Sequence, residues 1–159
     1  MATAKKATAK KAAPKDAIAM LKADHKKVSG LFAEFEKARA ASTKKKLVTT
    51  ICTELSVHAQ VEEDVFYPAV KAALKDKVLI PEAVVEQATM KALIGQIEGV
   101  EPDGEMYDAK VKVLSEYVKH HVKEEHTEMF PKAAKTRLDM VALGAQMAAR
   151  KSELLAAAR

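Results

Sequence analysis

Two segments of this chain share one pattern: a histidine is followed four residues later by a glutamate and ten residues later by a proline. The segments span residues 58–68 and 121–131, and 63 residues separate each pair of matching positions. A spacing of four places His58 and Glu62, and likewise His121 and Glu125, on one face of a helix. A helical hairpin that occurs twice predicts a four-helix bundle with these side chains pointing inward.

The composition agrees with a helical fold. The 159 residues include only five glycines, five prolines and no tryptophan, which argues against a turn-rich β protein. Apolar residues recur at helical spacing in four stretches. The first covers residues 14–40, the second begins at residue 42 or 43 and runs into the segment that ends at Pro68, the third begins at Pro81, and the fourth follows the turn at 101–104. A further amphipathic stretch covers residues 136–157.

The predicted fold is therefore all-α. It consists of an up-down-up-down four-helix bundle over residues 16–132, with an additional C-terminal helix within 133–159. That helix would pack outside the bundle or against another subunit. Residues 1–15 form a Lys/Ala-rich tail that is predicted to be disordered, because it lacks the apolar residues needed for a core.

Polar residues occupy positions of the apolar stripes where the pattern calls for core residues. A buried carboxylate without a partner costs several kcal/mol, so Glu62 and Glu125 need an explanation. Bound cations would provide it, with a set of five ligand candidates: His25, His58, Glu62, His121 and Glu125. The alternative is a buried hydrogen-bonded network of the same histidines and glutamates.

The formal net charge of +5 lies entirely in the tail. Residues 1–15 carry five lysines and no acid, whereas the whole chain has 27 Lys and Arg against 22 Asp and Glu. These lysines (Lys5, Lys6, Lys10, Lys11 and Lys15) predict either contact with DNA through phosphate neutralisation or a merely solubilising tail.

The remaining features indicate a cytoplasmic protein. The single cysteine, Cys52, excludes an intramolecular disulfide and suits a reducing compartment. The sequence shows neither an apolar run long enough to span a bilayer nor a secretory signal, so no membrane partner is predicted.

The chain resembles the hemerythrin-like (HHE cation-binding) family. The resemblance rests on Asp24-His25 and on the two segments His58…Glu62-Glu63…Phe66…Pro68 and His121…Glu124-Glu125…Phe130-Pro131. It implies a non-haem di-iron centre in the bundle. By that resemblance His25 and His58 bind one metal ion, His121 binds the other, and Glu62 and Glu125 bridge the two.

One position departs from the family pattern, because Gln87 stands where the family usually has a histidine. An amide oxygen is a weaker ligand than an imidazole for iron or zinc. Three alternatives follow: Gln87 binds weakly, Glu86 replaces it, or the second metal ion keeps an open position. The Gln87-side position would then also accept Zn²⁺ or Mn²⁺. His120 and His126 lie on other faces, where they are either solvated or in contact with the ligands.

Three functions are compatible with these residues. The first is a dinuclear metal protein that serves oxygen or redox sensing, iron handling or reaction with peroxide. Oxygen transport is not expected, since oxygen-carrying hemerythrins use a histidine-richer ligand set. The second is a metal-dependent phosphodiesterase that nicks DNA, which the tail would bring near. The third is a nucleoid-associated scaffold. Whether the protein is an enzyme, and its oligomeric state, stay open.

Overall fold

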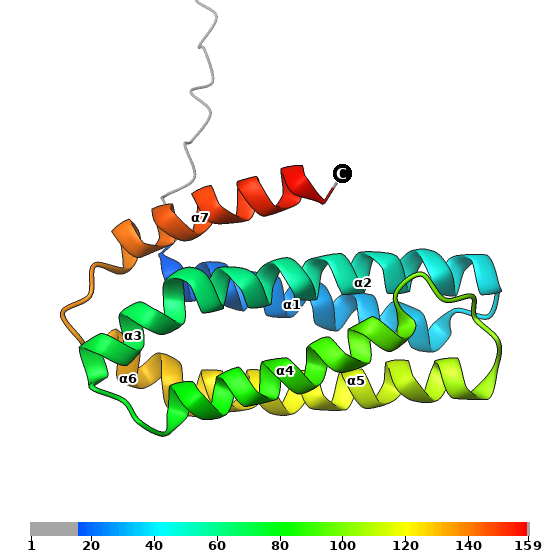
Figure 1. Cartoon of the computed structure of the whole chain (residues 1–159), viewed down its shortest axis with the longest axis horizontal. Helices are drawn as coiled ribbons and strands as arrows, with labels where there is room; N and C mark the ends of the chain where they lie inside the picture. Colours follow the sequence, from blue (N-terminus) through cyan, green and yellow to red (C-terminus); the bar gives the residue numbers. More distant parts are fainter. Residues whose placement is uncertain (1–15, 159) are drawn as a thin grey trace, which may run out of the picture.

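The computed structural model describes residues 16–158, and the ordered elements in this range are helices (Figure 1). The predicted basic tail and its five lysines lie outside the described residues. In chain order the elements are α1 (Ala17–Lys37), α2 (Ala41–Val61), η1 (Glu62–Phe66), α3 (Tyr67–Leu74), α4 (Leu79–Ile97), α5 (Glu105–Glu124), η2 (Glu125–Met129), α6 (Phe130–Ala134) and α7 (Met140–Ala157). Among the residues from 16 to 158, no helix is long and apolar enough to cross a membrane.

Nine elements make only five rods, because two rods contain a π-helical turn. The helix α2 runs through η1 into α3, and α5 runs through η2 into α6. The backbone at Val61 and Tyr67, on either side of η1, stays in the right-handed helical region, so the rod is continuous. These two rods, with α1 and α4, form the bundle, which confirms the all-α prediction.

Short connections make consecutive rods antiparallel neighbours. Only residues 38–40 separate α1 from α2, and residues 98–104 separate α4 from α5. The two hairpins α1–α2 and α4–α5 show the most extensive contacts between helices. Aspartate side chains begin several helices: Asp16 accepts from the Ala19 amide at 2.7 Å, and Asp76 accepts from the Leu79 and Ile80 amides at 3.1 and 2.7 Å.

The core is divided into two apolar clusters. One surrounds Phe66, Phe130, Val70 and Leu21 near the end where α3 and α6 lie, and the other surrounds Phe32, Ile51, Leu114 and Ile97 toward the opposite end. Six of the buried polar side chains (His25, His58, Glu62, Gln87, His121 and Glu125) occur on the bundle helices between the residues of these two clusters. The bundle therefore contains a polar layer between two apolar cores.

The predicted C-terminal helix is present and lies against the outside of the bundle. Figure 1 shows α7 running along α1 and α2, and both helices contact it, as does η1. Asp139 caps its N-terminus by accepting from the Val141 and Ala142 amides. Leu143 and Met147 are buried and join the apolar cluster that includes Leu21 and Val57. Docking of α7 thus extends the apolar cluster that surrounds Leu21 and Phe66.

Candidate metal centre

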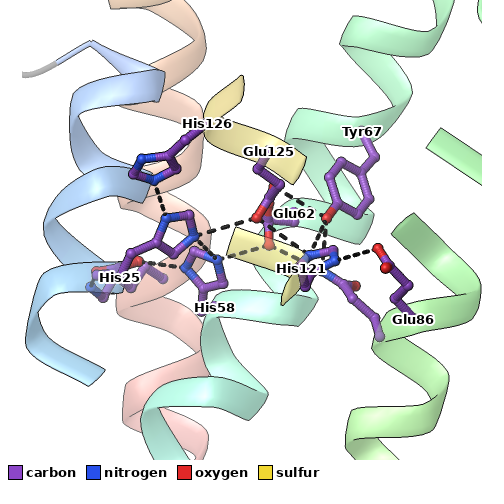
Figure 2. Close-up of polar contacts among 11 residues, drawn as sticks. His25, His58, Glu62, Tyr67, Glu86, His121, Glu125 and His126 are labelled. Atoms are coloured by element: carbon purple, nitrogen blue, oxygen red, sulfur yellow. Dashed lines mark hydrogen bonds and ion pairs between the residues drawn. The ribbon is translucent and has the colours of Figure 1, made fainter. Parts of the chain in front are cut away.

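Side chains from three rods, together with Gln87 of α4, form one buried polar cluster (Figure 2). His25 comes from α1, His58 from α2 and His121 from α5, while the two glutamates open the π-helical turns, Glu62 in η1 and Glu125 in η2. The carboxylates are 0% and 1% exposed. The five ligand candidates predicted from the sequence are therefore brought together.

The Nε2 atoms of the three histidines face the carboxylates. His58 Nε2 lies 2.8 Å from Oε1 of Glu62, and the Nε2 atoms of His121 and His25 lie 3.3 and 3.4 Å from Oε1 of Glu125. Two groups of potential ligand atoms result: His25 with His58 and Glu125, and Glu62 with His121 and Glu125. Within each group the atoms lie within 4.8 Å of one another, and Glu125 belongs to both.

The other ring nitrogen of each histidine has a partner on the outer side of the cluster. The Nδ1 atoms of His58 and His121 lie 2.9 Å from carboxylate oxygens of Asp24 and Glu86, respectively. The Nδ1 atom of His25 lies 2.8 Å from Nε2 of His126. The carboxylate partners of His58 and His121 hold the proton on Nδ1 and leave Nε2 to face inward, as in metal-binding histidines.

The contacts also show where the remaining polar residues near the cluster lie. Glu86 lies on the outer side of the cluster, where it contacts Nδ1 of His121 at 2.9 Å. Gln87 itself points into the cluster, and its amide nitrogen donates to Oε1 of Glu62 at 3.0 Å. His126 contacts His25, whereas the His120 side chain is 62% exposed and pairs with Glu86 and Glu124.

Tyr67 is a member of the cluster that the sequence did not reveal. Its hydroxyl lies 3.1 Å from Nε2 of His121 and 3.3 Å from Oε2 of Glu125, and it accepts from the Gln87 amide at 3.1 Å. The residue follows Glu62 by five positions, which in an α-helix would place it on another face. The π-helical turn, in which the Tyr67 amide donates to the Glu62 carbonyl, brings both onto one face.

The two halves differ at matching positions. His25 in the first half corresponds to Gln87 in the second, and Tyr67 in the first corresponds to Phe130 in the second. The Phe130 ring stacks on His25 with 6.1 Å between ring centroids, while Tyr67 bonds to Gln87. One end of the cluster thus pairs an imidazole with a phenyl ring, and the other pairs an amide with a phenol.

Two buried carboxylates close to one another shift the pKa values of the cluster. Burial and the charge of Glu62 raise the pKa of Glu125 to about 7. Burial disfavours the charged form of His58, but the charge of Glu62 and the Asp24 hydrogen bond outweigh it and raise the pKa of His58 to about 10. Without a bound cation, protons therefore balance the negative charge of the glutamates.

Several oxygens in the cluster lack a hydrogen-bond donor. They are Oε2 of Glu62, Oε1 of Glu125 and Oε1 of Gln87, all on buried side chains. Each such buried acceptor costs about 1–3 kcal/mol. Carboxylate and imidazole donors suit iron, manganese and zinc, so cations would satisfy the orphaned oxygens and replace the protons. The residues present therefore fit bound metal cations.

Residues 16–133 match the Hemerythrin HHE cation binding domain. The chain belongs to this family. A crystal structure of a hemerythrin HHE cation-binding domain-containing protein from Mycobacterium kansasii is similar at a TM-score of 0.77 and 25% identity, over 91% of this chain and 90% of that one. A "DNA nickase" from Nostoc sp. is 30% identical over 111 residues, or 70% of this chain. The chain spans only 31% of the length of that relative.

The metal-free protein is expected to lose stability as the pH rises from about 5 to about 8. Folding raises the pKa of Glu125 from 4.5 to about 7 and that of His58 from 6.5 to about 10. Groups with raised pKa values stabilise the folded state while protonated, and this contribution is lost as they are deprotonated. A cation displaces the same protons, so its stabilising effect should grow over the same range.

Thermal unfolding across this pH range, with and without Co²⁺, measures both trends. The variant Glu125→Gln serves as the control, because it removes the Glu125 titration and should flatten the metal-free profile below neutral pH. A wild-type midpoint that rises with pH in the metal-free protein would contradict the assignment.

Proposed function

We propose that this chain holds two metal ions, most suitably iron, in a carboxylate-bridged centre. His25 and His58 would hold one ion and His121 the other, with Glu125 and Glu62 between them. The observation that supports this most directly is that Glu125 belongs to two groups of buried ligand atoms, each with an oxygen that lacks a donor. Tyr67 would add a phenolic oxygen on the side where Gln87 replaces a histidine.

The surroundings of the centre favour a small, uncharged reactant. A cavity of about 30 Å³ adjoins His58, Glu62 and His121, and its other walls are largely apolar, with Val28, Leu55, Met90 and Ile94 among them. This volume holds roughly one or two water-sized molecules. Two iron ions would supply redox chemistry toward dioxygen or peroxide. The apolar wall limits access of bulk water, and the Tyr67 hydroxyl and Gln87 amide offer hydrogen bonds beside the ligands. We therefore favour oxygen or redox sensing, or handling of iron and peroxide.

Metal content tests the proposal. Wild-type protein loaded anaerobically with Fe²⁺ should retain about two ions per chain, and Glu62→Gln should lose at least one of them, because a neutral amide replaces a charged ligand. Glu63→Gln is a matched control, since Glu63 is the next residue but lies outside the cluster and forms a partly exposed pair with Lys91 at 2.7 Å. Element-resolved analysis gives the count. No retained iron in the wild type, or equal content in the two variants, would contradict the ligand set.

A tyrosine bound to ferric iron produces a charge-transfer band in the visible spectrum. Wild-type protein loaded with iron and oxidised should show this band, and Tyr67→Phe should abolish it while near-ultraviolet absorption of the centre remains. Tyr117→Phe is the control, because Tyr117 is 45% exposed on the flank of the bundle. A band that survives Tyr67→Phe would leave Tyr67 as a hydrogen-bond donor only.

Nicking of DNA is the second candidate function, and it is favoured by the similarity to the Nostoc protein. The lysines of residues 1–15 would attract DNA phosphates, and two cations would stabilise the attacking and leaving oxygens during cleavage of a phosphodiester. The enclosed position of the ligands opposes it, because a duplex cannot enter a cavity of this size. If the centre cleaves DNA, metal-loaded wild type and Glu63→Gln should nick supercoiled plasmid and Glu62→Gln should not. Nicking that Glu62→Gln leaves unchanged would exclude the centre as its source.

A further inference from the structure

The C-terminal helix reaches the ligand cluster through one side chain. Nζ of Lys151 on α7 lies 2.8 Å from Oδ1 of Asp24, and the other oxygen of Asp24 lies 2.9 Å from Nδ1 of His58. The ring of His58 then presents Nε2 to Glu62. A continuous path of polar contacts therefore connects α7, which lies beyond the segment matching the family, with a ligand candidate.

The contact is held by the packing of α7 on the bundle. Leu143 and Met147 are buried in the cluster that contains Leu21, and Lys151 follows Met147 by one helical turn on the same face. Asp24 is 18% and Lys151 30% exposed at the side chain, so the pair is partly shielded from solvent. Such a pair is positioned more firmly than an exposed ion pair.

In the part of the chain that the structure describes, the matching acid of the other half has no such contact. Glu86 holds Nδ1 of His121 as Asp24 holds Nδ1 of His58, and the two acids stand at matching positions before Gln87 and His25. The second oxygen of Glu86 faces the exposed His120 at 3.2 Å. Within residues 16–158, no lysine or arginine lies within ion-pair distance of Glu86. Among the described residues, a lysine therefore pairs with the acid behind His58 and none pairs with the acid behind His121.

We propose that Lys151 is a positioning residue for the metal centre, which couples docking of α7 to metal binding at the His58 side. The ammonium group fixes the Asp24 carboxylate, which holds the His58 ring with Nδ1 outward and Nε2 inward. Coupling is reciprocal, so a bound ion must stabilise docked α7 by the factor by which docked α7 strengthens binding. This inference rests on the proposed function, because it needs His58 to bind a metal ion.

Lys151 has two opposing effects on metal affinity, and the sign of the change in affinity on substitution shows which effect is larger. Positioning of His58 strengthens metal binding, whereas the positive charge of the ammonium repels a cation. Removing the charge with Lys151→Met should therefore weaken binding if positioning dominates and tighten it if repulsion dominates. Contact partners of metal-binding histidines typically contribute 10- to 100-fold in affinity, and Lys151 acts one contact further out, so we expect a loss of about 3- to 10-fold.

The experiment is an anaerobic Co²⁺ titration of the full chain, followed by visible absorption, for wild type, Lys151→Met, Lys151→Arg and Arg150→Gln. Arg150 is the matched control: it precedes Lys151 on α7 and pairs with Asp64 of η1 at 2.9 Å. We expect Lys151→Met to bind more weakly and with an altered spectrum, and Lys151→Arg to restore both. Arg150→Gln should stay within about twofold of wild type, since its loss affects only the surface ion pairs with Asp64 and Glu153.

Hydrogen exchange of residues 140–157 gives the reciprocal measurement. Co²⁺ should slow exchange of α7 amides in the wild type and have little effect in Lys151→Met. Unchanged or tighter Co²⁺ binding by Lys151→Met, or an equal loss in Arg150→Gln, would overturn the positioning role while leaving the proposed function intact. A wild type that binds no Co²⁺ would overturn both.

Discussion

The burial of two carboxylates at one level of a small helical bundle is the constraint on which the other features of the structure depend. Glu62 and Glu125 are almost fully removed from solvent, and like charges this close cannot both be ionised without compensation. The three inward-facing imidazoles, the Tyr67 hydroxyl and the Gln87 amide all point toward these oxygens. The acids Asp24 and Glu86 in turn orient two of the imidazoles. The polar layer between the apolar clusters is thus organised from the carboxylates outward.

Much of this arrangement follows from side-chain spacing. The repeated four-residue interval places His58 with Glu62 and His121 with Glu125 on core faces, and the 63-residue repeat predicts that both pairs lie at the same level. The observed ion-pair distances within each pair agree with that prediction. The structure also confirms the fifth helix, whose amphipathic pattern the sequence displays.

Neither the position of Tyr67 in the cluster nor the contact between Lys151 and Asp24 could be predicted from the sequence, and the reasons differ. Periodicity arguments assume 3.6 residues per turn, and a π-helical turn has no comparable signature in the sequence, so periodicity alone does not place Tyr67 beside Glu62. Lys151 lies 127 positions from Asp24, and such a contact depends on how α7 docks. The amphipathic pattern of α7 shows which face is buried but not which acid its lysine meets.

The distribution of ligand candidates between the hairpins has a mechanical consequence. Neither hairpin contains a complete group: His25, His58 and Glu62 belong to the first, and His121 and Glu125 to the second, while Glu125 is needed by both groups. An ion bound at either group is therefore a cross-link between chain segments that lie about 60 to 100 residues apart in the sequence. Like a disulfide, a cross-link of this length restricts the unfolded chain most when the loop that it closes is long. Bound metal ions would thus act as reversible cross-links that join the two hairpins into one cooperative unit.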